Sequence, residues 1–191
     1  MSSLLNSVIE ELVYENIFVA TGMLSLAFSG GVQAYDGTIN FVGKILDQTC
    51  SVTTGSKNMT VTLPAVSKAL LDTTAKTAAL TPFIIELNGC DAGASSGGQN
   101  VKAYFEPNAT TDFNTGNLTN TGTAKNVQVQ LLNADGSTPV VLGKDVASQN
   151  TVATRIDTSD IKLRYNARYY ATGAATAGDV AATVNYTIAY E

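Results

Sequence analysis

The last stretch of the chain alternates apolar and polar residues from Asp179 to Glu191 with almost no break. Successive side chains of a β-strand point to opposite faces of a sheet, so this pattern predicts a long strand with one buried face. An ordinary final strand would explain the alternation, but not why so long a strand stands at the end of the chain. The apolar face consists of Val180, Ala182, Val184, Tyr186, Ile188 and Tyr190.

Shorter alternating runs, separated by turn residues, follow one another after Tyr35. They predict strands at residues 38–46, 50–53, 59–63, 83–87, 101–106, 126–132, 140–142 and 162–170. Asp135-Gly136 between two apolar runs predicts a hairpin, and residues 65–78 predict a helical turn or two. Many short strands with almost no helix indicate an all-β sandwich, for which the immunoglobulin-like arrangement is the best-populated choice.

An uncharged apolar run ends in small residues at positions 17–34. Val32-Gln33-Ala34 fits the small-x-Ala pattern of signal-peptidase sites, so residues 1–34 are interpreted as a signal peptide cleaved after Ala34. The apolar core from Ile17 to Phe28 is short for a membrane span. The preceding residues are acidic rather than basic, and the first basic residue is Lys44, which leaves open whether Met1 is the true start.

The composition excludes several classes of function. The chain has no His, which excludes a His-based triad, a proton shuttle or a His-containing metal site. A net charge of −5 provides no basic surface for nucleic acid. Asp157 and Asp160 remain as a carboxylate pair, but they lie in a Thr- and Ser-rich turn. We therefore expect no enzymatic activity, cofactor, metal, nucleic acid or small-molecule substrate.

Two cysteines, Cys50 and Cys90, follow the export signal. An even count in an exported chain favours a single disulfide, whereas in a cytosolic enzyme the two would more often be inert thiols. The bridge would close a loop of about 40 residues and contribute roughly 3–4 kcal/mol in the chain-entropy model.

Four sequence motifs carry a resemblance to a known family. They are GTINFVG at 37–43 ahead of a Cys-Ser-Val context, TPFIIELNGC at 81–90, RYYATGAAT at 168–176, and Gly178 fourteenth from the end with Tyr190 penultimate. On these motifs, residues 35–191 resemble the type 1-like fimbrial major subunits of the chaperone–usher pilin family.

The resemblance implies an incomplete immunoglobulin-like β-sandwich that lacks its last strand and is completed by a donor strand from a neighbouring subunit. The donor would be the extension 35–46, followed by a pilin domain at 47–191. Its groove-facing residues would be Ile39, Phe41, Gly43 and Ile45, with Gly43 allowing close backbone approach.

The same resemblance implies an acceptor groove beside the C-terminal strand, with residues 50–53 on the opposite wall. The surface for the donor and for a chaperone would comprise Gly178, Val180, Val184, Tyr186, Ile188 and Tyr190.

The implied partners are identical or related pilin subunits, a periplasmic chaperone and an outer-membrane usher. The chain would pass through the periplasm into a fimbrium on a Gram-negative cell surface, for adhesion or biofilm formation. A tip adhesin is disfavoured because a mature chain starting at Tyr35 has no room for an extra lectin domain. Two alternatives stay open: a minor adaptor or terminator subunit of the same fimbria, and a monomeric secreted binding module.

Overall fold

The computed structural model describes residues 37–43, 50–92 and 99–191, and the chain divides into two units, Met1–Lys44 and Ile45–Glu191. In the first unit, residues 37–43 form neither helix nor strand. Three apolar side chains of this segment are highly exposed: Ile39 at 79%, Phe41 at 91% and Val42 at 98%. The predicted signal peptide and Ile45 lie outside the described residues.

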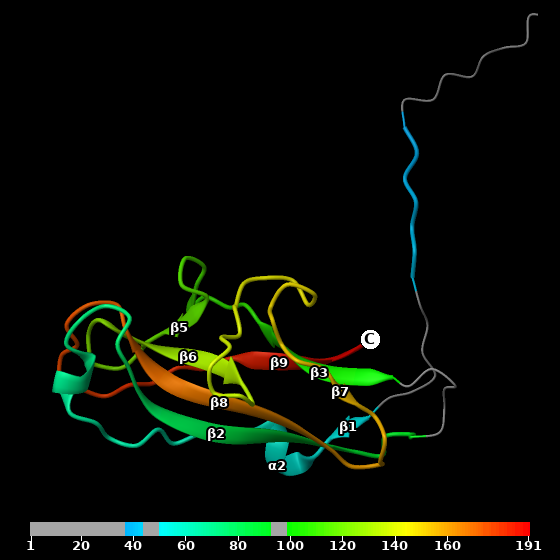
Figure 1. Ribbon diagram of the computed structural model, residues 1–191, viewed down its shortest axis with the longest axis horizontal. Coiled ribbons are helices and arrows are strands. Elements are labelled where there is room, and N and C mark those ends of the chain that lie inside the picture. The colour runs from blue at the N-terminus through cyan, green and yellow to red at the C-terminus, as the bar shows by residue number, and fades with distance from the viewer. Residues whose placement is uncertain (1–36, 44–49, 93–98) are drawn as a thin grey trace, which may run out of the picture. The chain divides into compact units, whose positions relative to one another are not determined.

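The second unit consists of two antiparallel sheets (Figure 1). One has the strand order β1-β2-β8-β6-β5-β4 and the other β7-β3-β9. The strands are β1 Ser51–Val52, β2 Thr77–Asn88, β3 Asn100–Glu106, β4 Thr111–Asp112, β5 Asn117–Thr119, β6 Val127–Asn133, β7 Thr154–Arg155, β8 Ile161–Ala171 and β9 Asn185–Tyr190. Between β1 and β2, the described residues form a short helix, α2 Thr54–Lys57, and a 3-10 turn, η1 Lys68–Leu71.

The core lies between the two sheets. Ile161, Leu163 and Tyr165 of β8 are buried in alternation with exposed residues, as the period of a strand requires. Across the core, Phe105 of β3 places its ring edge-on to Tyr165, with centroids 5.1 Å apart. The backbone N–H of Ala103 donates to the Tyr165 hydroxyl at 3.1 Å, which joins the two sheets. The predicted all-β sandwich is confirmed.

Several elements differ from the sequence-based expectation. Residues 140–142 form no strand, and a single bridge joins Leu132 to Pro139 nearby. The helical turn expected at residues 65–78 is limited to η1. Strands β4, β5 and β7 have two or three residues each, too few to show a period in the sequence. The hairpin at Asp135-Gly136 is present, with Gly136 at φ 64° and its N–H bonded to Asn133 O.

Two segments with clear alternation are not strands. Residues 59–63 were expected to form one, and the last strand was expected to begin at Val180, yet β9 begins at Asn185. Assignment to a sheet requires a hydrogen-bonded neighbour as well as an alternating pattern, and these two segments face an unfilled space. Among residues 37–43, 50–92 and 99–191, no helix is long and apolar enough to cross a membrane.

Candidate strand-acceptor groove

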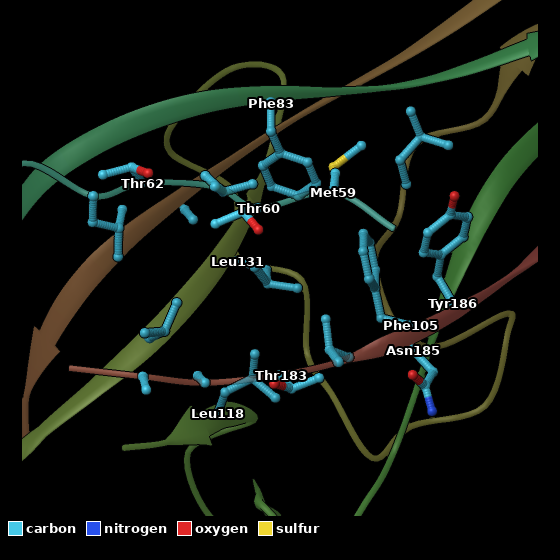
Figure 2. A pocket seen from close by; sticks show the side chains of 18 of the residues that line it. Met59, Thr60, Thr62, Phe83, Phe105, Leu118, Leu131, Thr183, Asn185 and Tyr186 are labelled. Carbon is cyan, nitrogen blue, oxygen red and sulfur yellow. The ribbon is translucent and has the colours of Figure 1, made fainter. Parts of the chain in front are cut away.

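A groove of about 670 Å³ lies between these two segments (Figure 2). One wall is formed by residues 56–63 and the other by residues 180–186. In Figure 2, Met59, Thr60 and Thr62 lie on one side, and Thr183 and Asn185 lie on the other. The floor is the apolar core itself, contributed by Phe83, Ile85, Phe105, Leu118, Val129, Leu131, Ala167 and Tyr169.

In the wall at residues 56–63, helix α2 is followed by residues 59–63, which have the side-chain alternation of a strand. Met59, Val61 and Leu63 are half-buried, and the intervening Thr60 and Thr62 are exposed. Leu63 O accepts a long hydrogen bond from the Tyr169 hydroxyl at 3.5 Å. Within the described part of the chain, the backbone groups of residues 59–62 have no hydrogen-bond partner. This wall therefore offers unpaired donors and acceptors.

The wall at residues 180–186 has the same character. Val180, Ala182 and Val184 are half-buried, and Ala181 and Thr183 are exposed. The odd-numbered residues bond away from the groove: Ala181 O accepts from Thr121 N at 2.8 Å, and Thr183 O accepts from Asn108 Nδ2 at 2.9 Å.

The N–H and C=O of one strand residue point to the same edge, and the next residue points to the other. The backbone groups of the even-numbered residues therefore face the groove. Among the described residues they have no partner.

The open edge continues along β9. This strand pairs with β3 on one side and ends its sheet on the other. Asn100 and Glu191 exchange backbone hydrogen bonds of 3.2 and 3.0 Å, so the odd-numbered residues of β9 bond to β3. Tyr186, Ile188 and Tyr190 consequently direct their backbone groups to the open edge.

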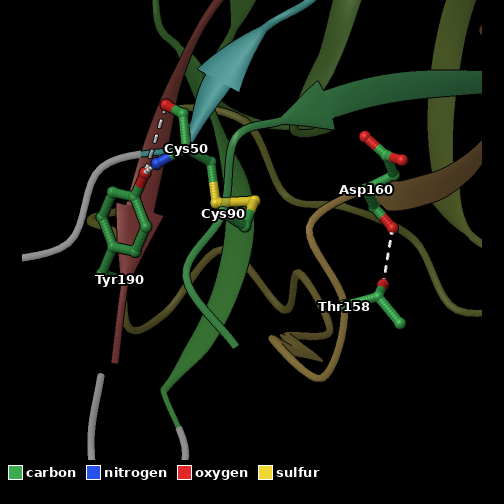
Figure 3. The surroundings of a disulfide bond; sticks show 5 residues. All are labelled: Cys50, Cys90, Thr158, Asp160 and Tyr190. Atoms are coloured by element: carbon green, nitrogen blue, oxygen red, sulfur yellow. Dashed lines mark hydrogen bonds between the residues drawn. A yellow bond between two sulfur atoms is a disulfide. The ribbon is translucent and has the colours of Figure 1, made fainter. Parts of the chain in front are cut away.

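Two tyrosine hydroxyls of β9 form hydrogen bonds with residues at the start of the domain. The Tyr186 hydroxyl donates to Ser56 O at 2.7 Å, and Cys50 N donates to the Tyr190 hydroxyl at 2.7 Å. Figure 3 shows the Tyr190 contact beside the disulfide between Cys50 and Cys90. Burial raises the pKa of the Tyr186 phenol above its ordinary value of 10.0. The predicted disulfide is confirmed.

The predicted acceptor residues fall into two groups. Val180, Val184 and Tyr186 line the groove, whereas Gly178, Ile188 and Tyr190 do not. Gly178 packs against the backbone of Ala124, and a Cβ there would lie 2.5 Å from Ala124 N.

The opposite wall is also displaced from its expected place: it is formed by residues 56–63 rather than 50–53, because β1 pairs with β2 in the other sheet. Sequence analysis missed this wall, although the alternation at residues 59–63 was the available signal.

The arrangement suits an extended polypeptide. An apolar floor between two unpaired edges can take alternate apolar side chains downward and backbone hydrogen bonds on both sides. In the described residues, no group of three or more His, Cys, Asp or Glu could hold a metal ion. The Asp157–Asp160 turn is closed by the Thr158 hydroxyl, which donates to Asp160 O at 2.8 Å (Figure 3).

Comparison with known proteins assigns the family. Residues 63–191 match the model described as type-1 fimbrial protein, A (FimA). The chain belongs to this family. It is 58% identical to the F17 fimbrial protein of Escherichia coli over 172 residues, which cover 89% of the chain and 96% of that protein. It is 46% identical to the major fimbrial subunit SMF-1 of Stenotrophomonas maltophilia over 164 residues, covering 82% and 94%.

Solved structures support the immunoglobulin-like pilin fold. The P pilus rod subunit PapA matches with a TM-score of 0.56 at 18% identity, covering 74% of this chain and 99% of PapA. A subunit of a chaperone–usher pilus, solved to explain rod uncoiling, also gives 0.56 at 20% identity, covering 83% and 97%. At these identities the likeness concerns the fold.

Proposed function

We propose that this chain is the structural subunit of a chaperone–usher fimbria and polymerises when each groove accepts the N-terminal segment of a neighbouring copy. The observation that carries the proposal is a pair of walls on either side of an apolar floor. In one wall the backbone groups of residues 59–62, and in the other those of Val180, Ala182 and Val184, have no hydrogen-bond partner among the described residues. A space between two such edges is what β-augmentation fills. The names of the relatives, which are fimbrial subunits, support the same function.

The proposed donor is the extension at residues 35–46, of which the structure describes residues 37–43. Ile39, Phe41 and Gly43 alternate on one face, and the two large apolar side chains are exposed. Burial of each would contribute roughly 1.5–3 kcal/mol, and each ladder hydrogen bond about 1 kcal/mol net. With about eight to ten such hydrogen bonds, at about 1 kcal/mol each, the sum rivals the roughly 5–15 kcal/mol that stabilise an ordinary domain. Strand donation would therefore decide whether the subunit is stable.

The open groove also supports a role for a chaperone before assembly. An apolar cleft with two unpaired edges is an aggregation hazard for a free subunit. We propose that a periplasmic chaperone supplies a temporary strand, and that an outer-membrane usher exchanges it for the next subunit's donor. The Cys50–Cys90 disulfide is in keeping with passage through an oxidising compartment.

A minor subunit of the same fimbria is the second candidate. The chain is 38% identical over 165 residues to the minor fimbrial subunit HifD of Haemophilus influenzae, covering 82% of the chain and 75% of that protein. Electron microscopy after deletion of the gene separates the two roles. Loss of whole fibres indicates the rod subunit, and shortened or tipless fibres indicate the minor one.

The substitution Gly43→Leu tests strand donation. A leucine side chain would prevent close approach of the donor backbone to the groove, so we expect export without fibres. The matched control is Val42→Leu, a bulky change on the opposite face of the same segment. Fibres at wild-type yield from Gly43→Leu would refute the donor role. Loss of fibres in both variants would mean that the face assignment is wrong.

A further inference from the structure

Residues 179–183, which include the first part of the groove wall, lie beyond the end of β3, the strand that pairs with β9. Strand β3 ends at Glu106, which faces Asn185 in the antiparallel register. Two residues further along each chain, Asn108 faces Thr183, but the β3 chain turns away there and only the Asn108 side chain still bonds to Thr183 O. A different part of the molecule must hold residues 179–181.

Residues 120–124, in the loop between β5 and β6, hold residues 179–181 in place. Asn120 is its centre: Ala181 N donates to Asn120 Oδ1 at 2.8 Å, and Asn120 Nδ2 donates to Asp179 O at 3.2 Å. The same side-chain amide also bonds within the loop. Gly122 N donates to Asn120 Oδ1 at 2.8 Å, and Asn120 Nδ2 donates to Ala124 O at 2.8 Å. One half-buried side chain thus forms four hydrogen bonds, all to backbone groups.

Threonine hydroxyls and backbone groups complete the attachment. The Thr121 hydroxyl donates to Ala181 O at 3.0 Å, and Asp179 N donates to the Thr123 hydroxyl at 2.8 Å. Thr121 N donates to Ala181 O at 2.8 Å, and Ala124 N donates to Asp179 O at 3.0 Å. The approach is close enough to require glycine on the loop, because a Cβ at Gly122 would lie 2.2 Å from Asp179 O. The loop therefore bonds to Asp179 and Ala181 much as a neighbouring strand would, although it is not one.

From this arrangement we propose that Asn120 is a positioning residue for strand acceptance, and that the loop at residues 120–124 preorganises the groove wall. With Asp179 and Ala181 held on their outer side, Val180 and Ala182 must turn their backbone N–H and C=O groups into the groove. The incoming strand then meets an edge that is already ordered, so less conformational entropy is lost when it binds. This role rests on the proposed function and adds a residue to it.

The consequence is kinetic. When Asn120 holds the wall, the wall is already in the geometry that binds the donor before the donor arrives. Without Asn120, only a fraction of the molecules have that geometry at any moment. Loss of the two bonds from Asn120 to the wall should therefore slow association of the donor about tenfold, which corresponds to about 1.4 kcal/mol for the two bonds together. The floor and the opposite wall would be unchanged.

The experiment measures association of a labelled synthetic peptide with the sequence of residues 35–46, in excess over dilute full-length chain. We expect Asn120→Ala to bind about tenfold more slowly than wild type, and Asn120→Asp, which keeps the acceptor for Ala181 N, to fall between them. Hydrogen exchange of the Ala181 amide in the free chain should accelerate in Asn120→Ala and stay slow in Asn120→Asp.

Asn133→Ala is the control for a purely structural effect. Asn133 also fixes a loop through its amide, with bonds to Asn150 O and from Val152 N, but none of its hydrogen bonds reaches a groove wall. We expect it to lower Tm with little change in the association rate. If Asn120→Ala does not fold, Asn108→Ala gives the same comparison through Thr183.

An unchanged association rate in a folded Asn120→Ala would overturn the positioning role. Failure of the peptide to bind the wild-type chain would instead count against strand acceptance itself.

Discussion

The hydroxyl of Tyr186 donates a hydrogen bond of 2.7 Å to the backbone oxygen of Ser56, which lies 130 residues earlier in the chain. Ser56 is 3% exposed, so its carbonyl has little access to water as an alternative partner. The bond joins the edge strand β9 to the start of the opposite groove wall, and fixes the width of the groove at that end.

Removal of this hydroxyl should destabilise the domain. In Tyr186→Phe the ring remains beside Phe105, but the Ser56 carbonyl loses its donor, and we expect a loss of about 1–2 kcal/mol in the free energy of unfolding. Chemical denaturation measures it. Tyr104→Phe is the control, because among the described residues the Tyr104 hydroxyl has no hydrogen bond. Equal stability of Tyr186→Phe and wild type would show that the bond contributes nothing.

Stability should be insensitive to pH near neutrality and should fall in alkali. The chain has no His to titrate near neutral pH. Loss of solvent on burial raises the pKa of Tyr165, Tyr169 and Tyr186 above the ordinary value of 10.0. Because the folded pKa lies above the unfolded one, the neutral tyrosines stabilise the fold fully below about pH 10, and this contribution is lost as pH rises further.

A titration of Tm from pH 6 to 11 checks this expectation. The decline above pH 10 should be shallower in Tyr186→Phe, which lacks one of the raised groups. A steep decline between pH 6 and 9 would contradict it.

Deletion of Tyr190 and Glu191 should yield a subunit that is degraded before assembly. It removes the Tyr190 contact to Cys50 N, the backbone bonds between Glu191 and Asn100, and the ion pair between Glu191 and the buried Lys102. Loss of its partner leaves the Lys102 ammonium uncompensated in a site where its side chain is 6% exposed.

The periplasmic level of the deleted chain, followed by immunoblot, is the measurement. Glu191→Gln isolates the ion pair. Since Glu191 is half-exposed, we expect this substitution alone to lower the free energy of unfolding by about 1 kcal/mol. Stable accumulation of the deleted chain at the wild-type level would count against the prediction.

The double substitution Cys50→Ala/Cys90→Ala should lower the free energy of unfolding by roughly 3–4 kcal/mol, from the restored freedom of the 40-residue loop in the unfolded chain. Guanidinium denaturation of the variant, compared with wild type treated with a reductant, measures the loss. If the free energies of unfolding of the variant and of the reduced wild type differ by more than the error of the fits, packing of the substituted side chains contributes as well as the disulfide.

Several features were determined by the sequence because they depend on local pattern. The alternation from Asp179 to Glu191 predicted a strand with one buried face, of which Asn185–Tyr190 is strand β9, and the export signal with two cysteines predicted their disulfide. The absence of His limited the chemistry directly. The family motifs indicated a missing strand, in agreement with the two unpaired walls.

Only the tertiary structure decided which segments meet. Residues 59–63 carry a strand pattern, but the pattern does not say that they face residues 180–186 rather than pair with a neighbour. The bonds of Asn120 to Asp179 and Ala181 join a turn to a segment about 60 residues away, and an Asn-Thr-Gly turn does not predict such bonds. Side-chain periodicity is a property of each segment alone, whereas the partner of each backbone edge is set by how the two sheets pack.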